Sequence, residues 1–486
     1  MPPQINFEPI IEEIKNAPNS ITVFGKLKKT YPRGFFLDSS NNDRRLGRFS
    51  FVGCDPFLIF KSKRDSISLE WKDEKPREEF KANPFFALKN IIRSYNQTRN
   101  SLKLPFVSGG VGYFAYDMKD FIEKLPDIAK DDLGLPECVF GFHDVVIIYD
   151  NLKKTAYIAS SGLPEIAPEA RAKKAQERLE EFKEIVSSAS PNIRSYALTS
   201  KMDILKPNIS KSSYIESVKK AKDYIRKGDI YQVNLSQRFE ADLNMDTFEL
   251  YGRLRRFSAA PFSSYLDFDD VAVLSSSPER FLLKRGDYIE TRPIKGTRPR
   301  GEDPYDDSRL EGELLASQKD RAEHIMIVDL ERNDLGRICK YGSVWPSELM
   351  SLEKYSTVFH LVSTVSGRLR KNVGPMDCLL ATFPGGSITG APKIRAMEII
   401  EELEPAKRSI YTGSIGYISF DGNMDTSIVI RTFVVKGKKV YFQVGGGIIA
   451  DSDPEKEYEE TIDKARGLMR ALGVEEDVRV KLEARI

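Results

Sequence analysis

The order of extended and helical segments constrains the fold of this chain more than any other sequence feature. Helix-like periodicity in the second half occurs at residues 213–227, 311–330, 392–403 and 454–472. Strand-like runs occur at residues 272–275, 426–435 and 439–444. Because helices do not separate these strands one by one, a doubly wound parallel sheet is disfavoured. An α+β fold with large, mostly antiparallel sheets is expected.

The first part of the chain, to about residue 160, is dominated by short strands bounded by turn residues. They are expected at 35–39, 49–53, 109–114 and 144–150. A charged helix follows at 164–186, and the serine-rich stretch 187–192 is typical of a linker. A chain of 486 residues exceeds the usual size of one core. We therefore predict two regions, residues 1–205 and 206–486.

Composition disfavours several classes of protein. The formal net charge is +2, so no electrostatic footprint for nucleic acid is expected. No apolar run approaches about 18 residues and no signal-peptide pattern is visible, so neither a membrane span nor secretion is expected. The four cysteines lie far apart, which fits a reducing cytoplasm. With only three histidines, a histidine-based metal site or catalytic triad is disfavoured.

The lysine at position 295 has unusual neighbours. It lies between Ile294 and Gly296, in a run with three arginines between positions 292 and 300. Nearby cations and burial both favour the neutral amine. Neutralising a lysine near pH 7 requires an environment worth roughly 4–5 kcal/mol, which a cationic pocket can supply. Two interpretations follow from these residues alone: Lys295 is a nucleophile, or it is a solvated lysine at the end of a strand.

Two predicted helices contain carboxylates at helical spacing. Asp320 and Glu323 share one face of the first, and Glu457, Glu460 and Lys464 share a face of the second. Oxygen ligands without His or Cys suit Mg²⁺, which keeps several waters and accepts a substrate carboxylate or phosphate. Solvated helix faces explain the same spacing, so both interpretations stand.

Two glycine-rich segments and one arginine complete the candidate pocket. Residues 385–393 lack the phosphate-loop pattern, because Pro392 precedes the lysine and no Ser or Thr follows it. A glycine loop before a helix with Pro392 in its first turn can still present backbone N–H groups to an anion. Glycines 445–447, directly after a strand, permit close approach of a ligand. Arg431, in an apolar strand, needs a carboxylate partner if buried. These features indicate a pocket for a small, multiply carboxylated substrate.

Several ordered motifs resemble a known family. They are Ser-Pro-Glu-Arg-Phe at 277–281, Pro-Ile-Lys-Gly-Thr at 293–297, Asp-Arg-Ala-Glu-His at 320–324, Asp-Leu-Glu-Arg-Asn-Asp at 329–334, Gly-Ala-Pro-Lys-Ile-Arg-Ala-Met at 390–397 and Gly-Asn-Met-Asp at 422–425. This set is similar to the chorismate-utilising enzymes over about residues 210–475, and the motif at 47–53 extends the resemblance toward the N-terminus.

The resemblance implies the anthranilate synthase component I-like fold, in which large antiparallel sheets pack as a sandwich with flanking helices. It would make residues 206–486 the chorismate-binding catalytic region. Residues 1–205 would form an N-terminal region with elements of a tryptophan pocket.

Two positions distinguish branches of that family. Members that add water have a lysine base where this chain has Gln232, which favours ammonia as the nucleophile. Anthranilate synthases usually have alanine at the position of Lys295, whereas aminodeoxychorismate synthases have the lysine. The resemblance therefore implies amination of chorismate at C4 to 4-amino-4-deoxychorismate, for para-aminobenzoate and folate biosynthesis. Anthranilate synthase component I is the rival interpretation, and a non-catalytic chorismate- or tryptophan-binding module is the remote one.

The resemblance also implies roles for individual residues. Lys295 would add covalently to C2 of chorismate, Glu279 would act as general acid, and His324 would be structural. The Mg²⁺ ligands would be Glu323 and Glu460, with Asp320 and Glu457 orienting ligands or waters. The substrate-binding residues would be Arg431, Tyr411, Ser387, Gly447, Lys464, Gln232 and His360.

Two further molecules are implied by the same resemblance. No cysteine lies in a glutaminase-type nucleophile elbow, so a glutamine amidotransferase subunit would supply ammonia as component II of a heterodimer. A pocket for L-tryptophan between the sheets would be formed by Ser39, Leu46, Gly47, Arg48, Phe49, Pro261, Phe262 and Ser263. In this branch tryptophan would be a structural ligand, which argues against feedback control.

Overall fold

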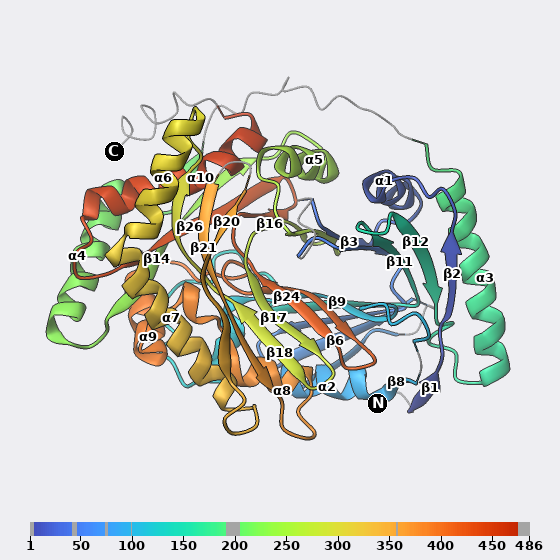
Figure 1. Ribbon diagram of the computed structural model, residues 1–486. Helices are drawn as coiled ribbons and strands as arrows, with labels where there is room; N and C mark the ends of the chain where they lie inside the picture. The colour runs from blue at the N-terminus through green and yellow to red at the C-terminus, as the bar shows by residue number, and fades with distance from the viewer. Residues whose placement is uncertain are drawn as a thin grey trace.

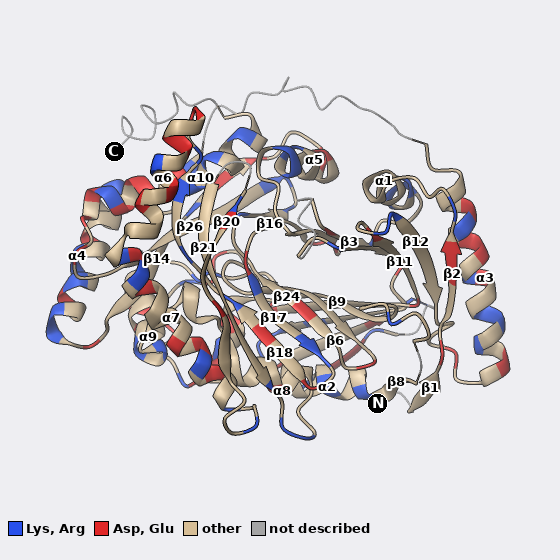
Figure 2. Ribbon diagram, in the orientation of Figure 1, with Lys and Arg blue, Asp and Glu red and all other residues tan. Residues whose placement is uncertain are grey.

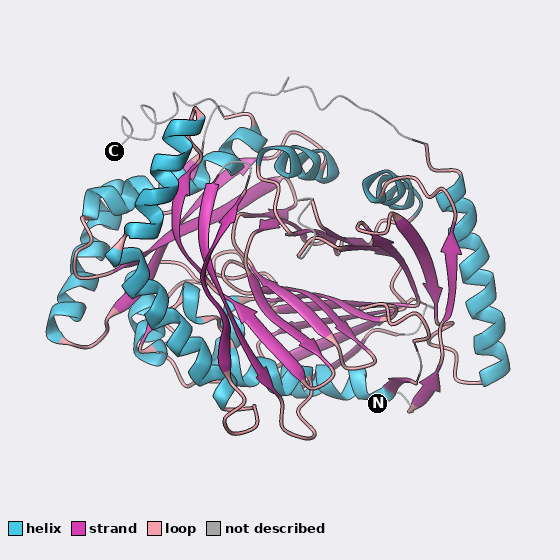
Figure 3. Ribbon diagram, in the orientation of Figure 1, coloured by secondary structure: helices cyan, strands magenta, loops and turns pink. Residues whose placement is uncertain are grey.

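The chain folds around two large β-sheets that face each other, with helices on the outside (Figures 1 and 3). The computed structural model describes residues 4–40, 46–72, 76–98, 100–190, 205–355 and 358–474. Neighbouring strands in the two large sheets are antiparallel. The predicted α+β fold with large antiparallel sheets is therefore confirmed.

The first sheet has twelve strands. Their order is β19 (Ile294–Pro299), β21 (Val358–Arg368), β18 (Tyr288–Arg292), β17 (Arg280–Arg285), β24 (Met424–Ile428), β23 (Ser414–Ser419), β9 (Gly109–Phe114), β10 (Cys138–His143), β5 (Leu58–Lys63), β6 (Ser66–Trp71) and β7 (Glu78–Lys81), with β20 (Trp345–Lys354) paired to β21.

The second sheet also has twelve strands. Their order is β13 (Lys206–Pro207), β14 (Gln232–Asp242), β26 (Lys439–Ile448), β25 (Thr432–Lys436), β16 (Ala272–Ser277), β15 (Phe262–Asp267), β3 (Gly34–Asp38), β4 (Phe49–Cys54), β11 (Val145–Asp150), β12 (Thr155–Ser160) and β2 (Ile10–Ile14), with β22 (Gly390–Ala391) paired to β14. A separate parallel pair is formed by β1 (Ile5–Phe7) and β8 (Tyr95–Gln97).

An apolar core fills the space between the two sheets. Phe35 and Phe51 of the second sheet meet Val111, Val139 and Tyr417 of the first, and each is at most 5% exposed. Alternate side chains of each strand point into this layer, as expected for two sheets packed face to face. The predicted sandwich is confirmed.

Helices cover the outer faces of both sheets (Figure 3). Those packed on the second sheet are α1 (Ser20–Thr30), α3 (Pro168–Ser187), α4 (Lys211–Lys227), α5 (Thr247–Phe257), α9 (Lys393–Leu403) and α10 (Pro454–Leu472). Those packed on the first are α2 (Pro84–Ser94), α7 (Gln318–Gly336) and α8 (Pro375–Thr382). The remaining helical segments are α6 (Pro304–Ala316), η1 (Tyr116–Phe121) and η2 (Gly386–Ile388). Basic and acidic residues are interspersed along α3 and α10 (Figure 2). Across the ranges given above, no helix is both long and apolar enough to cross a membrane.

Each large sheet contains strands from both predicted regions. In the first sheet β23 pairs with β9, and in the second β15 pairs with β3, so hydrogen bonds cross the proposed boundary. The boundary at residues 205 and 206 stays a prediction. The predicted linker ends outside the described residues, because positions 191 and 192 are not among them.

The prediction of one continuous strand at 426–435 is wrong. The chain leaves the first sheet at the end of β24 and enters the second as β25, so one predicted strand is two. Arg431 lies between them with φ = +51°, a left-handed conformation that no regular strand contains. Arg431 is therefore at a crossing between sheets, and not inside a strand.

Three further local predictions need correction. The helix predicted at 311–330 is the end of α6 and most of α7, because Ser317 is extended and its side chain accepts the Asp320 N–H. Pro392 is the residue before α9, and not part of its first turn. Glycines 445–447 lie inside β26, where they pair with β14, and not after a strand.

Candidate active site

The candidate active site lies where corresponding ends of the two sheets meet α7 and α10 (Figure 1). Lys295 is on β19, at the end of the first sheet, and Glu279 immediately precedes β17. Glu323 is on α7 and Glu460 is on α10, which packs on β26 of the second sheet. Residues distant in sequence thus converge because both sheets end at the same place.

Ser387 connects the two predicted catalytic residues. Lys295 Nζ donates to the Ser387 carbonyl oxygen over 2.9 Å. Ser387 Oγ donates to Glu279 Oε1 over 2.5 Å. One residue of η2 therefore fixes an amine and a carboxyl group next to each other.

The pKa of Lys295 is lowered, chiefly by burial, and the Lys464 ammonium adds to this effect. The carboxylates of Glu323, Glu279 and Glu460 act in the opposite direction. Two causes were expected, burial and the arginines of the same segment. Each arginine pairs with a carboxylate instead, as Arg292 with Glu348, Arg298 with Asp320 and Arg300 with Asp307. The predicted direction and the predicted effect of burial agree with the structure, whereas the predicted effect of the arginines is wrong.

Burial raises the pKa of Glu279 to about 7, although the Ser387 hydroxyl and the Lys295 ammonium both favour the carboxylate. The residue is 5% exposed. A carboxyl group with this pKa holds a proton over part of the neutral range and can release it there.

Two carboxylates from different helices flank Lys295. Burial raises the pKa of Glu323, which lies 4.0 Å from the Lys319 ammonium. The ammonium of Lys464 lowers the pKa of Glu460, with which it forms a 2.7 Å ion pair. Lys464 also donates to the Gly445 carbonyl oxygen over 2.9 Å, so α10 is tied to β26 at this point.

A glycine leaves room for these groups. A Cβ atom at Gly446 would lie 3.3 Å from Glu457 Oε2, 3.6 Å from Glu460 Oε1 and 3.8 Å from Lys464 Nζ. Glu457 Oε1 accepts from the Ser452 hydroxyl over 2.6 Å, whereas its buried Oε2 has no hydrogen-bond partner within the described ranges. A buried carboxylate oxygen without a partner indicates a place for a ligand, a water or a cation.

The donors at this site fit Mg²⁺. Glu323 and Glu460 are oxygen donors, and the charge of Glu460 contributes to the raised pKa of Glu323. In the ranges covered by the structure, no three His, Cys, Asp or Glu side chains form a group that could hold a metal ion. A cation here would need waters or a substrate carboxylate, which is how Mg²⁺ commonly binds. Asp320 pairs with Arg298 at 3.0 Å, so its role beside a metal stays a prediction.

His360 and Arg431 form a second polar group near Lys464. The Thr297 hydroxyl is 2.9 Å from His360 Nδ1, and the buried Nε2 has no hydrogen-bond partner among the described residues. Burial and the Arg431 cation lower the pKa of His360 to about 3, so the ring is neutral. Burial lowers the pKa of Arg431, and no carboxylate of the described residues forms an ion pair with it. A half-buried guanidinium without a carboxylate is suited to an anionic ligand.

Two other predicted substrate ligands differ in how they are placed. Gln232 Nε2 lies only 2.2 Å from the position of a Cβ at Gly447, so a side chain at 447 would displace this amide. Gln232 Oε1 is buried and has no hydrogen-bond partner among the residues that the structure describes. Tyr411 is buried beside Arg408, whose guanidinium is 5.9 Å from the ring centre, and lines a small cavity with Arg238. Its role as a substrate ligand stays a prediction.

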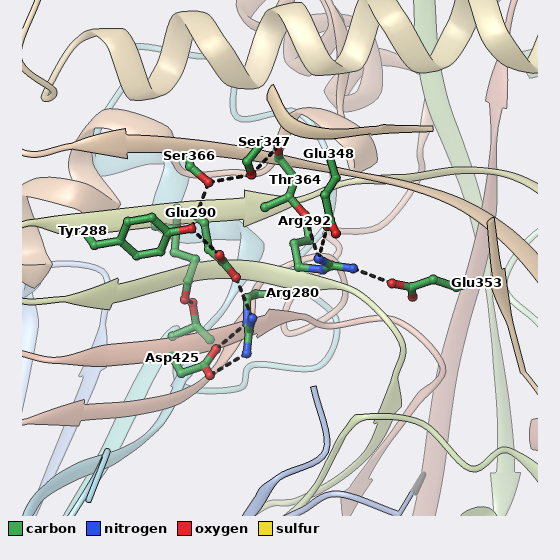
Figure 4. Close-up of polar contacts among 12 residues, drawn as sticks. Arg280, Tyr288, Glu290, Arg292, Ser347, Glu348, Glu353, Thr364, Ser366 and Asp425 are labelled. Atoms are coloured by element: carbon green, nitrogen blue, oxygen red, sulfur yellow. Dashed lines mark hydrogen bonds and ion pairs between the residues drawn. The ribbon is translucent and has the colours of Figure 1, made fainter. Parts of the chain in front are cut away.

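Paired charges support the strands around the site (Figure 4). Arg280 contacts both Glu290, at 2.7 Å, and Asp425, at 3.0 Å. Arg292, three residues before Lys295, contacts Glu348 at 2.9 Å and also pairs with Glu353. These arginines are at most 7% exposed and tie β17 and β18 to β24 and β20.

Sequence reasoning missed Glu331, which is 3% exposed and accepts the Gly386 N–H over 3.2 Å. It lies in the motif at 329–334, where only its family resemblance was noted. Lys393 was also missed. It pairs with Asp334 and donates to the Thr382 and Pro384 carbonyl oxygens over 2.9 and 2.8 Å, so its ammonium is occupied by groups of the protein.

A separate cavity of about 70 Å³ lies between the sheets, away from their ends. Five of the predicted tryptophan-pocket residues line it: Leu46, Phe49, Pro261, Phe262 and Ser263. Arg48 instead pairs with Asp150 at 2.7 Å, and the Gly47 carbonyl accepts from Asn151. The Ser39 N–H donates to Ser50 Oγ over 3.2 Å.

Comparison with known proteins shows the family to which the chain belongs. The chorismate binding enzyme family matches residues 34–470, and the chain belongs to this family. Anthranilate synthase component 1 of Acetivibrio thermocellus is 41% identical over 444 residues, covering 90% of each chain. Aminodeoxychorismate synthase component 1 of Escherichia coli K12 is 40% identical over 444 residues, covering 91% of this chain and 93% of the relative.

The fold agrees with a solved structure. Anthranilate synthase component I from Streptococcus pneumoniae TIGR4 superposes with a TM-score of 0.76 and 34% identity. The match covers 86% of this chain and 92% of that protein. The anthranilate synthase component I-like fold is therefore confirmed.

Proposed function

We propose that this chorismate-utilising enzyme replaces the C4 hydroxyl of chorismate with an amino group, giving 4-amino-4-deoxychorismate. The observation that carries the proposal is the pairing of Lys295 and Glu279 through Ser387, at 2.9 and 2.5 Å. A nucleophilic amine next to a carboxyl group that can donate a proton is what a displacement of hydroxide requires.

Lys295 is the proposed nucleophile. Its pKa is lowered mainly by burial, which increases the fraction of neutral amine. The lone pair forms a bond to C2 of chorismate, the ring double bond shifts, and the C4–O bond breaks. Glu279 transfers its proton to the departing oxygen, so water leaves and Glu279 becomes a carboxylate.

Ammonia completes the reaction. It forms a bond to C4, the double bond shifts back, and the C2–N bond to Lys295 breaks, so the lysine returns as a neutral amine. The carboxylate of Glu279 accepts the proton that the new ammonium group loses. Two displacements at the ends of one allylic system explain amination at C4. Gln232 supports ammonia over water, because this position has no basic side chain to activate water.

The two carboxylates of chorismate have proposed binding groups. Glu323 and Glu460 would hold Mg²⁺ together with the C1 carboxylate, near Lys464 and Gly447. The bound cation would withdraw charge from the ring diene. The Arg431 guanidinium and His360 Nε2, which has no hydrogen-bond partner in the part of the chain that the structure describes, would hold the enolpyruvyl carboxylate, assisted by Tyr411.

A second subunit is proposed as the source of ammonia. All four cysteines are buried and unpaired, and burial raises the pKa of each. Buried neutral thiols do not provide the reactive thiolate that glutamine hydrolysis needs. The relatives are named component 1, which supports a component 2 partner. We propose a glutamine amidotransferase in a cytoplasmic heterodimer.

Product analysis tests the proposed function. The protein is incubated with chorismate, Mg²⁺ and an ammonium salt, and the products are separated by chromatography and identified by mass. The expected product is 4-amino-4-deoxychorismate, which a lyase converts to para-aminobenzoate. Anthranilate as the main product would overturn the proposal and favour the anthranilate synthase reaction. Relatives of similar sequence identity are named for that reaction.

L-Tryptophan is the proposed ligand of the cavity between the sheets. Five predicted pocket residues line it, and Asp38 and Asp425 add carboxylates that suit an amino group. Calorimetric titration with tryptophan should show one site, and its addition should leave the rate of chorismate consumption unchanged. No binding would overturn this assignment, and strong inhibition would show that the ligand is regulatory.

A further inference from the structure

Glu331 is a buried carboxyl group that the proposed reaction does not use. It lies on α7, one turn beyond Ile327, and is 3% exposed. Its Oε1 accepts the Gly386 N–H over 3.2 Å, and the Thr291 hydroxyl also hydrogen-bonds to it. Glu331 therefore joins α7 and β18 to the turn that precedes Ser387.

The turn at Gly386 is pressed against α7. A Cβ atom at Gly386 would lie 2.7 Å from Leu330 Cδ2 and 3.4 Å from Glu331 Oε1. Lys393 holds the other side of the turn through the Thr382 and Pro384 carbonyl oxygens. The position of Ser387 is thus set by α7 on one side and by the Lys393 ammonium on the other.

The same helix also touches the backbone of the catalytic lysine. His324 Nδ1 is 3.3 Å from the Lys295 carbonyl oxygen, and His324 Nε2 is 2.6 Å from Ser363 Oγ. His324 and Glu331 are seven residues apart, so they lie on one face of α7. One helix face therefore positions both β19 and the turn that holds the Lys295 side chain.

We propose that Glu331 is a positioning residue for the amination. By holding the Gly386 N–H it fixes Ser387, whose carbonyl oxygen receives Lys295 and whose hydroxyl orients Glu279. This proposal rests on the catalytic roles proposed above for Lys295 and Glu279.

The carboxyl group can perform this role in either protonation state. Burial, followed by Asp334, raises the pKa of Glu331 to about 7, with a further contribution from Glu279 and an opposing one from Lys393. Both a carboxylate and a neutral carboxyl group accept a hydrogen bond from a backbone N–H. A glutamine at 331 has the same acceptor oxygen, so it should replace Glu331 in this function.

The test compares Glu331→Ala, Glu331→Gln and the matched control Glu401→Ala. Glu401 is also a buried helical glutamate that accepts backbone N–H groups, from Ile128 and Ala129, but it lies away from the site. Rates are followed as chorismate consumption, which does not depend on which amino product forms. The reactivity of Lys295 toward an amine-specific reagent is followed against pH by mass spectrometry.

Glu331→Ala is expected to lower kcat by roughly 10- to 100-fold with little change in KM, because a displaced Ser387 misaligns both catalytic groups. The apparent pKa of Lys295 in the labelling experiment should shift. Glu331→Gln should restore most of kcat and the original labelling profile. Glu401→Ala should lose thermal stability but keep kcat and the Lys295 profile.

The proposal is overturned if Glu331→Ala keeps kcat within about threefold and leaves Lys295 labelling unchanged. If the alanine variant does not fold, Glu331→Asp decides, because its shorter side chain keeps the carboxyl group but withdraws it from Gly386. Wild-type kcat and labelling in Glu331→Asp would overturn the proposal. A wild type that makes anthranilate would refute only the proposed product, since these ratios are measured independently of it.

Discussion

Two groups of polar side chains lie in or next to the first sheet and differ in how their members are paired. In the network of Figure 4, Arg280 and Arg292 each contact two carboxylates. In the second group, Lys295 on β19 has a carbonyl oxygen as its hydrogen-bond acceptor. Nε2 of His360 on β21 and Oε2 of Glu457 on α10 have no hydrogen-bond partner among the described residues.

The difference distinguishes side chains that stabilise the fold from side chains that are candidates for catalysis or binding. A buried charge without a partner is costly, so a fold keeps one where a ligand will supply the partner. The Arg292 network satisfies its own charges and needs no ligand. The proposed substrate and cation would supply the partners that atoms of the Lys295 group lack. Substitutions in the two groups should therefore have opposite consequences for stability and for activity.

The largest expected effect is the loss of activity in Lys295→Ala. Formation of 4-amino-4-deoxychorismate should fall by roughly 10³-fold or more, because the first displacement has lost its nucleophile. Ammonia could then add only at C2, so slow 2-amino chemistry should remain. Lys295→Arg, which keeps its proton, should be nearly inactive without redirection.

Chromatography of the products and thermal denaturation check this prediction together. Both variants should melt close to the wild type, because Lys295 makes no ion pair within the described part of the chain. Mass spectrometry of the wild type with chorismate and no ammonia should detect an adduct on Lys295. A Lys295→Ala variant that makes the 4-amino product at near wild-type rate would show that the covalent mechanism is wrong.

A comparable loss is expected from Glu323→Gln or Glu460→Gln, and from chelation of Mg²⁺ by EDTA. An amide is a weaker cation ligand than a carboxylate, so turnover should be abolished while the melting temperature changes little. Added Mg²⁺ should restore the EDTA-treated wild type but not the variants. Exposed Glu169→Gln is a matched control and should keep full activity. Full turnover in EDTA would refute the metal site.

The paired network should respond in the opposite way. Arg292→Met leaves the half-buried carboxylates of Glu348 and Glu353 without the Arg292 cation, so unfolding free energy should fall by about 1–3 kcal/mol. Denaturant unfolding measures this loss. The double variant Arg292→Met/Glu353→Leu should recover part of the lost stability, because it also removes an uncompensated carboxylate. If Arg292→Met is as stable as the wild type, the proposed distinction between the paired Arg292 network and the Lys295 group is wrong.

Arg431 provides a smaller and more specific test. Arg431→Met removes the proposed partner of the enolpyruvyl carboxylate, so KM for chorismate should rise by roughly 10- to 100-fold. Because Arg431 has no carboxylate partner among the residues in the structure, stability should not fall as it does in Arg292→Met. Steady-state kinetics and thermal denaturation of the two variants give the comparison. An unchanged KM would exclude Arg431 from the substrate pocket.

The sequence was sufficient to predict large antiparallel sheets, because the predicted helices do not separate the predicted strands one by one, as βαβ units would require. It also singled out Lys295, Glu279 and Glu323, which lie in the quoted motifs, and Glu460, which lies on a predicted acidic helix face. The roles of these four residues stay predictions. It could not predict that Ser387 joins Lys295 to Glu279, because these contacts span 92 and 108 residues of sequence. Periodicity also missed the break at Arg431, since apolar residues continue on both sides of its left-handed backbone.

The wrong expectation that neighbouring arginines lower the pKa of Lys295 also comes from contacts between distant parts of the sequence. Arginines at positions 292, 298 and 300 are adjacent to Lys295 in sequence, but their carboxylate partners come from other elements or later turns. Local sequence shows the cations and not the groups that neutralise them. Pairing across the fold decides which charges act on the lysine.

The smallest expected effect is the pH dependence caused by Glu279. Its folded-state pKa is raised to about 7, so between roughly pH 4.5 and 7 the native protein binds a proton that the unfolded chain has released. Stability therefore decreases as pH rises through this interval, and the contribution is constant above it. Glu279→Gln does not titrate, so the wild type should lose stability relative to this variant between pH 5 and 7.

Above about pH 7, kcat of the wild type should fall toward tenfold per pH unit as the acid loses its proton. Denaturant unfolding at pH 5, 7 and 8, with Glu169→Gln as the control, measures the first effect, and a pH–rate profile measures the second. A stability difference between wild type and Glu279→Gln that does not vary with pH would show that Glu279 is already ionised at pH 5 and cannot be the proposed acid.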